Sequence, residues 1–250
     1  MRKLRETMKI AVIGATGTVG KPLVKQLREA GHDVAELSRS TGVDLTTGEG
    51  LRDGLAGADV CVDVSMPMPA EGEDLVKASV AASERLLAAV EAEGVERVVF
   101  LSITNLDNPR VAEFEYYQAK VSQEETLRES SVPTSVVHSA QWMEFALNPA
   151  AVEETDDEVR VQDWLIQPVA AEEVARVLAE VAVTPGHRVI AGSEQIRLPD
   201  LTRKVLAAKG DGRPVKVVPP ALPAFADGSL VAPEGAEVAG PTPEEWVSTF

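Results

Sequence analysis

Residues 10–20 read IAVIGATGTVG, an apolar run that ends in three glycines spaced three apart, Gly14, Gly17 and Gly20. The apolar part predicts a short buried strand. The next stretch, residues 18–31, has apolar residues at helical spacing and ends at a glycine. Because glycine weakens regular structure, three of them between a strand and a helix point to a connection that tolerates no side chains.

The alternation of strand and helix continues along the chain. Strands without polar alternation, which are covered on both faces, are predicted at residues 32–38, 58–65, 95–102 and 132–139. Helices are predicted between them at residues 49–57, 73–94 and 112–131. This order predicts an α/β fold with a doubly wound, mostly parallel sheet of the Rossmann type.

The C-terminal third is less regular. It predicts an extended pair over residues 158–170, helices over 170–183 and 198–210, and strands over 186–192 and 214–220. We expect a single Rossmann-type domain over residues 1–250, with a dinucleotide-binding core at 8–139. Residues 140–168 and 193–250 are predicted to form a small substrate-covering lobe, and residues 169–192 a helix and strand that return to the core.

Charge and composition restrict the partners. The chain has 24 basic and 40 acidic residues, a net charge of −16, which repels nucleic acid and anionic membranes at long range. Cys61 is the only cysteine, which fits a reducing cytoplasm. No stretch approaches the ~20 apolar residues of a membrane span, and residues 1–7 read as a lead segment rather than an export signal. We expect a cytoplasmic protein with a small-molecule substrate; the pattern leaves a homodimer open.

Each glycine of the opening stretch has a predicted role. Gly14 allows the tight turn, Gly17 lets the main chain approach a diphosphate, and Gly20 lets the helix pack closely. The helix start near Thr18 presents free N–H groups and a partial positive charge to phosphates. The cofactor-binding residues predicted here are Gly14, Thr16, Gly17, Thr18, Val19 and Gly20.

The spacing in GATGTVG resembles the short-chain dehydrogenase/reductase superfamily, and most of all its atypical NmrA-like NAD(P)H-binding branch. The resemblance extends from Lys9 to about Gly192. It implies a dinucleotide cofactor, and the tip of the second strand indicates which one. Ser38, Arg39 and Ser40 suit a 2′-phosphate, which favours NADPH over NADH. The alternatives are that Arg39 is a solvated surface charge, and that Glu36 faces the ribose and selects NAD.

Three further residues are predicted to contact the cofactor. Asp44 resembles the family's acidic residue near the adenine, although a turn or helix-cap role is equally open. Val64 and Ser65 follow a central strand at the carboxyl edge of the sheet, where ligands of such folds bind. The neighbouring Met66 and Met68 fit either the pocket or ordinary packing.

Tyr116 and Lys120 stand four apart and share one face of a predicted helix. An ammonium one turn away lowers the pKa of a phenol, so the pair suits acid–base chemistry. By resemblance, Tyr116 donates a proton to a substrate carbonyl, Lys120 also binds the nicotinamide ribose, and Ser102 orients the carbonyl. Thr104 is the alternative to Ser102. Tyr117 has no lysine four residues on and is assigned to packing.

The substrate-side prediction rests on residues after the 132–139 strand. NmrA-like proteins often carry Arg-Pro here, whereas this chain has His138-Ser139. His138 is either an acid–base or substrate-binding group or, the reading we favour, a satisfied half-buried histidine. Three other residues resemble the family's substrate lining, with ordinary packing as the alternative: Gln141, Trp142 and Phe145. No histidine has acidic or cysteine neighbours at metal-ligand spacing, so no metal is expected.

Together these patterns predict an NADPH-dependent oxidoreductase that reduces a small carbonyl or enone-like substrate. The alternatives are a non-catalytic NAD(P)H sensor of the NmrA type and an epimerase or isomerase that retains its cofactor. Retention of the tyrosine, lysine and serine argues against the sensor.

Overall fold

The structure, a computed structural model, describes residues 7–67, 69 and 72–250. Most of the predicted lead segment and Met68 lie outside the described residues. The chain divides into two compact units. The first unit comprises Met1–Ser102, Gln118–Val137 and Ala175–His187. The second unit comprises Ile103–Tyr117, His138–Val174 and Arg188–Phe250.

A seven-stranded sheet organises the fold and has the strand order β12-β9-β5-β4-β3-β1-β2. The strands are β1 (Lys9–Ile13), β2 (Asp33–Leu37), β3 (Val60–Asp63), β4 (Arg97–Ile103), β5 (Thr134–Ser139), β9 (Arg188–Ala191) and β12 (Glu237–Val238). β1 pairs in parallel with β2 and β3, and β3 pairs in parallel with β4. The doubly wound, mostly parallel α/β fold predicted from the sequence is confirmed.

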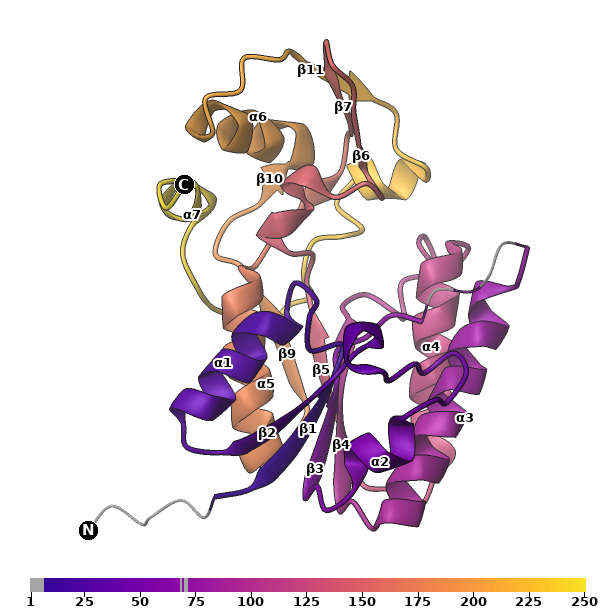
Figure 1. Ribbon diagram of the computed structural model, residues 1–250. Coiled ribbons are helices and arrows are strands. Elements are labelled where there is room, and N and C mark those ends of the chain that lie inside the picture. Colours follow the sequence, from indigo (N-terminus) through magenta and orange to yellow (C-terminus); the bar gives the residue numbers. More distant parts are fainter. Residues whose placement is uncertain (1–6, 68, 70–71) are drawn as a thin grey trace. The chain divides into compact units, whose positions relative to one another are not determined.

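Helices cover both faces of this sheet, as a parallel sheet requires. In Figure 1, α1 and α5 lie on one face and α2, α3 and α4 on the other. The helices are α1 (Gly20–Glu29), α2 (Leu51–Leu55), α3 (Leu75–Glu93), α4 (Glu115–Glu129) and α5 (Ala171–Val183). Each of them begins one to three residues later than the sequence predicts, for example α1 at Gly20 rather than near Thr18 and α4 at Glu115 rather than at Ala112.

The strand order fixes where a ligand can bind in the first unit. The chain runs from β1 outward to β2 and then returns across β1 to β3, so β1 and β3 flank the point where the order reverses. In open parallel sheets, the crevice beyond the carboxyl ends of the strands at such a point is the ligand site. The loops after β1, β2 and β3 therefore meet where a ligand is expected.

The core of the first unit packs these helices against the sheet. Leu51 and Leu55 of α2 and Leu86 and Val90 of α3 belong to one buried apolar cluster. Cys61, in the middle of β3, is in the same cluster and fully buried. Burial, together with the nearby Asp63 charge, raises the pKa of its thiol well above the ordinary value. A protonated, buried thiol is unreactive.

The second unit has its own core and two small sheets. β6 (Val152–Glu154), β7 (Val159–Gln162) and β11 (Val215–Val218) form a three-stranded sheet, and β8 (Leu165–Ile166) pairs with β10 (Ile196–Arg197). The prediction of an extended pair over 158–170 is wrong in its pairing: β7 lies between β6 and β11, and β8 pairs elsewhere. Apolar alternation indicates extended backbone but does not indicate which strand pairs with which.

Helices complete the second unit. α6 (Leu198–Ala208) lies at the predicted position, and Figure 1 shows it beside the three-stranded sheet. The last thirty residues contain a short helix that the sequence analysis left unassigned, α7 (Pro243–Val247). Its start is fixed by a capping box in which Thr242 and Glu245 bond to each other's backbone N–H groups. Among the described residues, no helix has the length and apolar content that crossing a membrane requires.

Candidate functional site

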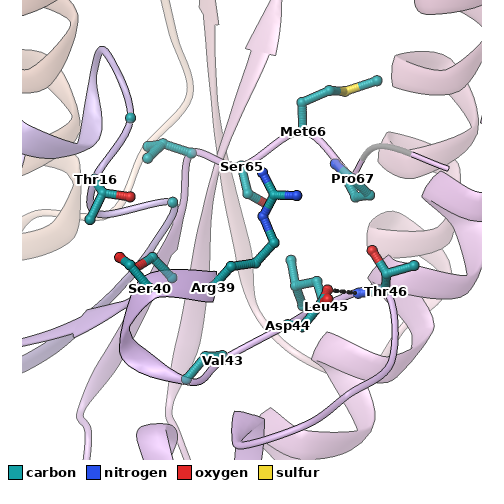
Figure 2. Close-up of a pocket in the computed structure, with 14 residues that line it drawn as sticks. Thr16, Arg39, Ser40, Val43, Asp44, Leu45, Thr46, Ser65, Met66 and Pro67 are labelled. Atoms are coloured by element: carbon teal, nitrogen blue, oxygen red, sulfur yellow. Dashed lines mark hydrogen bonds between the residues drawn. The ribbon is translucent and has the colours of Figure 1, made fainter. Parts of the chain in front are cut away.

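The first unit contains a pocket of about 440 Å³ at the carboxyl ends of β1, β2 and β3. Its walls come from the three loops that the strand order brings together. The lining residues are Gly14, Thr16, Gly17, Ser38, Arg39, Ser40, Val43, Asp44, Leu45, Thr46, Val64, Ser65, Met66 and Pro67. Nine of these were predicted from the sequence to contact a cofactor. Figure 2 shows Thr16 and Ser40 on one side of the space and Arg39 extending toward Ser65.

The glycine loop forms one wall, and each glycine meets a different constraint. Gly14 has a φ of +82°, which side chains rarely adopt, and a Cβ there would lie 3.1 Å from the Ser65 backbone. At Gly20 a Cβ would lie 2.0 Å from the Gly14 carbonyl oxygen, so only glycine lets α1 pack this closely. At Gly17 the nearest atom is the same oxygen at 3.2 Å. The predicted turn and packing roles of Gly14 and Gly20 therefore match the geometry.

The start of α1 follows this loop. Val19 is its N-cap, and no side chain caps the first N–H groups. Uncapped N–H groups and the positive end of the helix dipole favour an anion. Thr18, Val19 and Gly20 do not line the pocket, so their contact with a cofactor stays a prediction.

The tip of β2 supplies two hydroxyls and a guanidinium. The Ser38 and Ser40 hydroxyls lie 2.8 Å apart, and the 3-10 helix η1 (Arg39–Thr41) holds this turn. Arg39 is exposed and lines the pocket, and none of the described carboxylates forms an ion pair with it. Glu36, by contrast, forms an ion pair with Arg28 at 2.6 Å and does not line the pocket. The tip of β2 therefore presents the positive charge of Arg39, rather than the Glu36 carboxylate, to a ligand.

Asp44 serves the local turn and also lines the pocket. Its carboxylate accepts a hydrogen bond from the Thr46 N–H at 2.7 Å, the contact drawn in Figure 2. Its own N–H donates to the Glu49 carbonyl oxygen at 3.0 Å. The sequence analysis did not single out its neighbours Val43, Leu45 and Thr46. Their position in the loop after the predicted second strand is the feature of the sequence that could have identified them as pocket residues.

A buried charged cluster lies in the first unit around Lys120. The Lys120 side chain is 3% exposed, its Nζ donates to the Leu101 carbonyl oxygen at 3.2 Å, and it lies 4.6 Å from the Phe100 ring centroid. Burial lowers the pKa of Lys120 to about 8, while the charges of Asp63 and Glu124 oppose that change. Neither carboxylate was singled out from the sequence.

Ser102 joins the same cluster. Its hydroxyl is buried and donates a hydrogen bond to the Glu124 carboxylate. At the other side, Asp63 accepts hydrogen bonds from the Ser65 N–H at 2.9 Å and the Ser65 hydroxyl at 2.7 Å. Burial raises the pKa of Asp63. The structure therefore brings two of the three predicted catalytic residues, Ser102 and Lys120, to one carboxylate.

Tyr116 belongs to the second unit. It is partly buried against the second core, and its ring centroid lies 6.3 Å from that of Tyr117. Burial raises the pKa of Tyr116 to about 12. The lowered pKa expected from a lysine four residues on is therefore a wrong prediction. Desolvation of the phenol determines the direction, and the Lys120 ammonium donates to the Leu101 carbonyl oxygen and lies over the Phe100 ring.

The predicted substrate-side residues also lie in the second unit. The Thr104 hydroxyl and the Gln141 side-chain oxygen are buried and have no hydrogen-bond partner among the described residues. The ring centroids of Trp142 and Phe145 lie 6.2 Å apart, and the Trp142 Nε1–H donates to the Ser139 hydroxyl at 3.0 Å. His138 is half-buried in β5. Their contact with a substrate stays a prediction.

Curated relatives of the chain differ in what their names say they do. The chain is 26% identical over 159 residues to a photosystem II assembly factor Ycf39 of Cyanophora paradoxa, covering 58% of this chain and 49% of that protein. It is 28% identical over 226 residues to a (4-alkanoyl-5-oxo-2,5-dihydrofuran-3-yl)methyl phosphate reductase of Streptomyces griseus, covering 83% of this chain and 75% of that protein. The chain thus spans about half the length of the first of these relatives.

Solved structures share the fold. A short-chain dehydrogenase/reductase superfamily protein from Agrobacterium tumefaciens with bound NAD has a TM-score of 0.69 at 18% identity, covering 96% of each chain. A dTDP-4-dehydrorhamnose reductase from Bacillus anthracis in complex with NADP has a TM-score of 0.69 at 13% identity, covering 98% of each chain. The family model described as NAD(P)H-binding matches residues 14–185, which include the glycine loop, the β2 tip and the Lys120 cluster. The chain belongs to this NAD(P)H-binding family, within the short-chain dehydrogenase/reductase fold.

Proposed function

We propose that this protein is an NADPH-dependent oxidoreductase that reduces a small carbonyl or enone-like substrate, with Tyr116 as the proton donor. The observation that carries the proposal is the first-unit pocket, in which the glycine loop, with Gly14 and Gly17 in its lining, lies with an exposed Arg39 that pairs with no described carboxylate. The family match supplies the class of cofactor.

The residues present fit NADPH. Gly17 and the uncapped start of α1 suit the diphosphate, because Gly17 has no side chain and the first N–H groups of the helix have no side-chain cap. Ser38, Arg39 and Ser40 suit a 2′-phosphate, since a guanidinium binds phosphate through two parallel hydrogen bonds. Glu36, the residue that would favour NAD, is paired with Arg28 instead. When bound, the cofactor supplies a hydride to the substrate.

The protonation states suit reduction. With a pKa of about 12, Tyr116 is protonated at neutral pH and has a proton to donate. Lys120 keeps its charge below a pH of about 8 and so can stabilise the phenolate that forms once that proton leaves. Ser102 stands at the end of the strand that leads toward the tyrosine helix, as expected of the third catalytic residue.

Polar and aromatic groups of the second unit suit an oxygen-bearing substrate. The unpartnered Thr104 hydroxyl and Gln141 oxygen suit hydrogen bonds to a hydroxyl or carbonyl group. Trp142, Phe145 and Trp164 form a series of edge-to-face and tilted ring contacts, an apolar aromatic cluster in the same unit.

Tyr116→Phe tests the catalytic assignment, with Tyr117→Phe as the matched control from the adjacent position. We expect Tyr116→Phe to lower kcat for NADPH-dependent reduction of a carbonyl panel at least 100-fold, while NADPH binding by fluorescence titration stays within about twofold. Tyr117→Phe should retain turnover, because that side chain packs in the second core. Unchanged turnover in Tyr116→Phe, or loss of NADPH binding, would contradict the assignment.

A non-catalytic NAD(P)H-binding role is the second candidate, favoured by the similarity to Ycf39 proteins, which are named as assembly factors. The two roles differ in whether NADPH is consumed. A sensor would bind NADPH and leave its fluorescence constant for hours in the presence of every carbonyl tested. An oxidoreductase would consume it with at least one of them.

A further inference from the structure

The buried ammonium of Lys120 depends on charges that sequence reasoning did not single out. A lysine that is 3% exposed has lost most of its hydration, which favours the uncharged amine. The Leu101 carbonyl oxygen and the face of the Phe100 ring attract the ammonium, but neither carries a full negative charge. Full counter-charges come from Asp63 at the end of β3 and from Glu124 on the same helix as Lys120, α4.

The two carboxylates are not equivalent. Asp63 is buried and is held by the backbone and hydroxyl of Ser65, a residue that lines the dinucleotide pocket. Burial raises the pKa of Asp63, while its hydrogen bonds from Ser65 and the charge of Lys120 oppose that change. Glu124 is only partly buried, lies one helical turn after Lys120, and accepts the hydrogen bond of the Ser102 hydroxyl. Of these two carboxylates, Glu124 is the one that contacts Ser102, and both stabilise the Lys120 charge.

We propose that Glu124 is the positioning residue of this site: its carboxylate, held in place by the hydrogen bond from the Ser102 hydroxyl, keeps the Lys120 ammonium charged inside the protein. The inference rests on the proposed function for the role of Lys120. A serine hydroxyl has one proton, and here that proton is directed to Glu124. Ser102 therefore has to turn away from Glu124 before it can donate to a substrate carbonyl.

The consequence for the reaction follows from charge. A lysine ammonium stabilises a phenolate by its charge and hydrogen-bonds a ribose hydroxyl. A neutral amine stabilises a phenolate only poorly. Lys120 already titrates close to neutral pH, with a pKa of about 8. Removing the Glu124 charge would lower that pKa further, so a large fraction of the molecules would carry a neutral Lys120 under ordinary assay conditions. The charged groups that face Lys120 are Asp63 and Glu124, and Asp63 is unaltered by this change.

Glu124→Gln keeps the size of the side chain and removes its charge. The matched control is Glu125→Gln, the adjacent exposed carboxylate, for which the structure shows no ion pair with Lys120. The direct measurement is the 13Cε chemical shift of Lys120 in lysine-labelled full-length protein, assigned with Lys120→Arg and followed by NMR across neutral and alkaline pH. We expect a midpoint near 8 for the wild type and for Glu125→Gln, and a midpoint lower by roughly one pH unit or more for Glu124→Gln.

A second variant separates charge from side-chain size. Glu124→Asp retains the charge but shortens the side chain by one methylene, so Lys120 should titrate near its wild-type midpoint. We expect Glu124→Asp to leave the alkaline limb of kcat/KM near its wild-type pH, and Glu124→Gln to move that limb to lower pH. Circular dichroism melting shows which variants are folded, and Glu124→Ala, which also removes the charge, serves if Glu124→Gln is not.

The outcomes distinguish this inference from the proposed function. An unchanged Lys120 midpoint in folded Glu124→Gln overturns the role of Glu124, even if the protein is an NADPH-dependent reductase. If the midpoint falls as expected but the wild type neither binds nor consumes NADPH, the reductase proposal fails, and with it the catalytic meaning of the cluster. A lowered midpoint together with a shifted kcat/KM profile supports both.

Discussion

Arg39→Ala is the most direct perturbation of the cofactor preference. The Arg39 guanidinium is exposed at the pocket, and none of the described carboxylates pairs with it, so truncation leaves no buried charge behind. A hydrogen bond to a charged group contributes about 1.5–3 kcal/mol. Because Arg39 is exposed and screened by solvent, we take the lower part of that range, about 1.5–2 kcal/mol. This corresponds to a roughly 10- to 30-fold increase in the Kd for NADPH.

The assay is a fluorescence titration with NADPH and with NADH, which differ only in the 2′-phosphate. We expect Arg39→Ala to weaken NADPH binding as calculated and to leave the Kd for NADH within about twofold. Arg52→Ala is the control, since Arg52 is an exposed arginine of the same unit that pairs with Glu93 at 2.8 Å and lies outside the pocket. Equal losses for both dinucleotides, or no loss for NADPH, would refute the assignment of Arg39 to the 2′-phosphate.

Two further predictions concern stability. Gly20→Ala places a Cβ 2.0 Å from the Gly14 carbonyl oxygen and should lower the free energy of unfolding by about 2–4 kcal/mol in urea denaturation. The control Gly186→Ala, with open space around it, should change the free energy of unfolding by less than about 1 kcal/mol. Equal effects of the two substitutions would contradict the packing role of Gly20. For Lys120, the folded pKa of about 8 lies below the ordinary lysine value of 10.5. The unfolded chain therefore binds more protons between these values, and the free energy of unfolding should rise with pH across that window, by up to about 3 kcal/mol. Urea denaturation at several pH values should show this rise in the wild type and not in Lys120→Met, and a rise of the same size in both would assign it to other groups.

Local sequence signals predicted the first unit well. The glycine triplet, the unbroken apolar strands and the helical spacing are properties of short segments, and each segment formed the expected element. The parallel order followed from the alternation of strands and helices, so the loops after β1, β2 and β3 could be placed at one sheet edge. Most predicted pocket residues, including Arg39 and Asp44, were therefore found from their position after a strand.

The features that sequence reasoning missed depend on contacts between distant segments. Glu124 was one acidic residue among many on an exposed-looking helix, and only the fold brings its carboxylate to Ser102, 22 positions away. The pKa of Tyr116 was predicted in the wrong direction because helical spacing reveals a neighbouring lysine but not the burial of the phenol. The pairing of β7 with β6 and β11 was missed because short strands of similar composition allow several partners.

The single cysteine, Cys61, can be used to measure how often the protein opens. The Cys61 thiol is enclosed in the middle of β3, and its pKa is held well above the ordinary value, so a thiol-specific dye should not label the native molecule. Labelling then requires the central sheet to open, and its rate measures how often that happens. Dinucleotides that tighten the neighbouring loops should slow that rate, which would allow ligands to be ranked without any knowledge of the substrate.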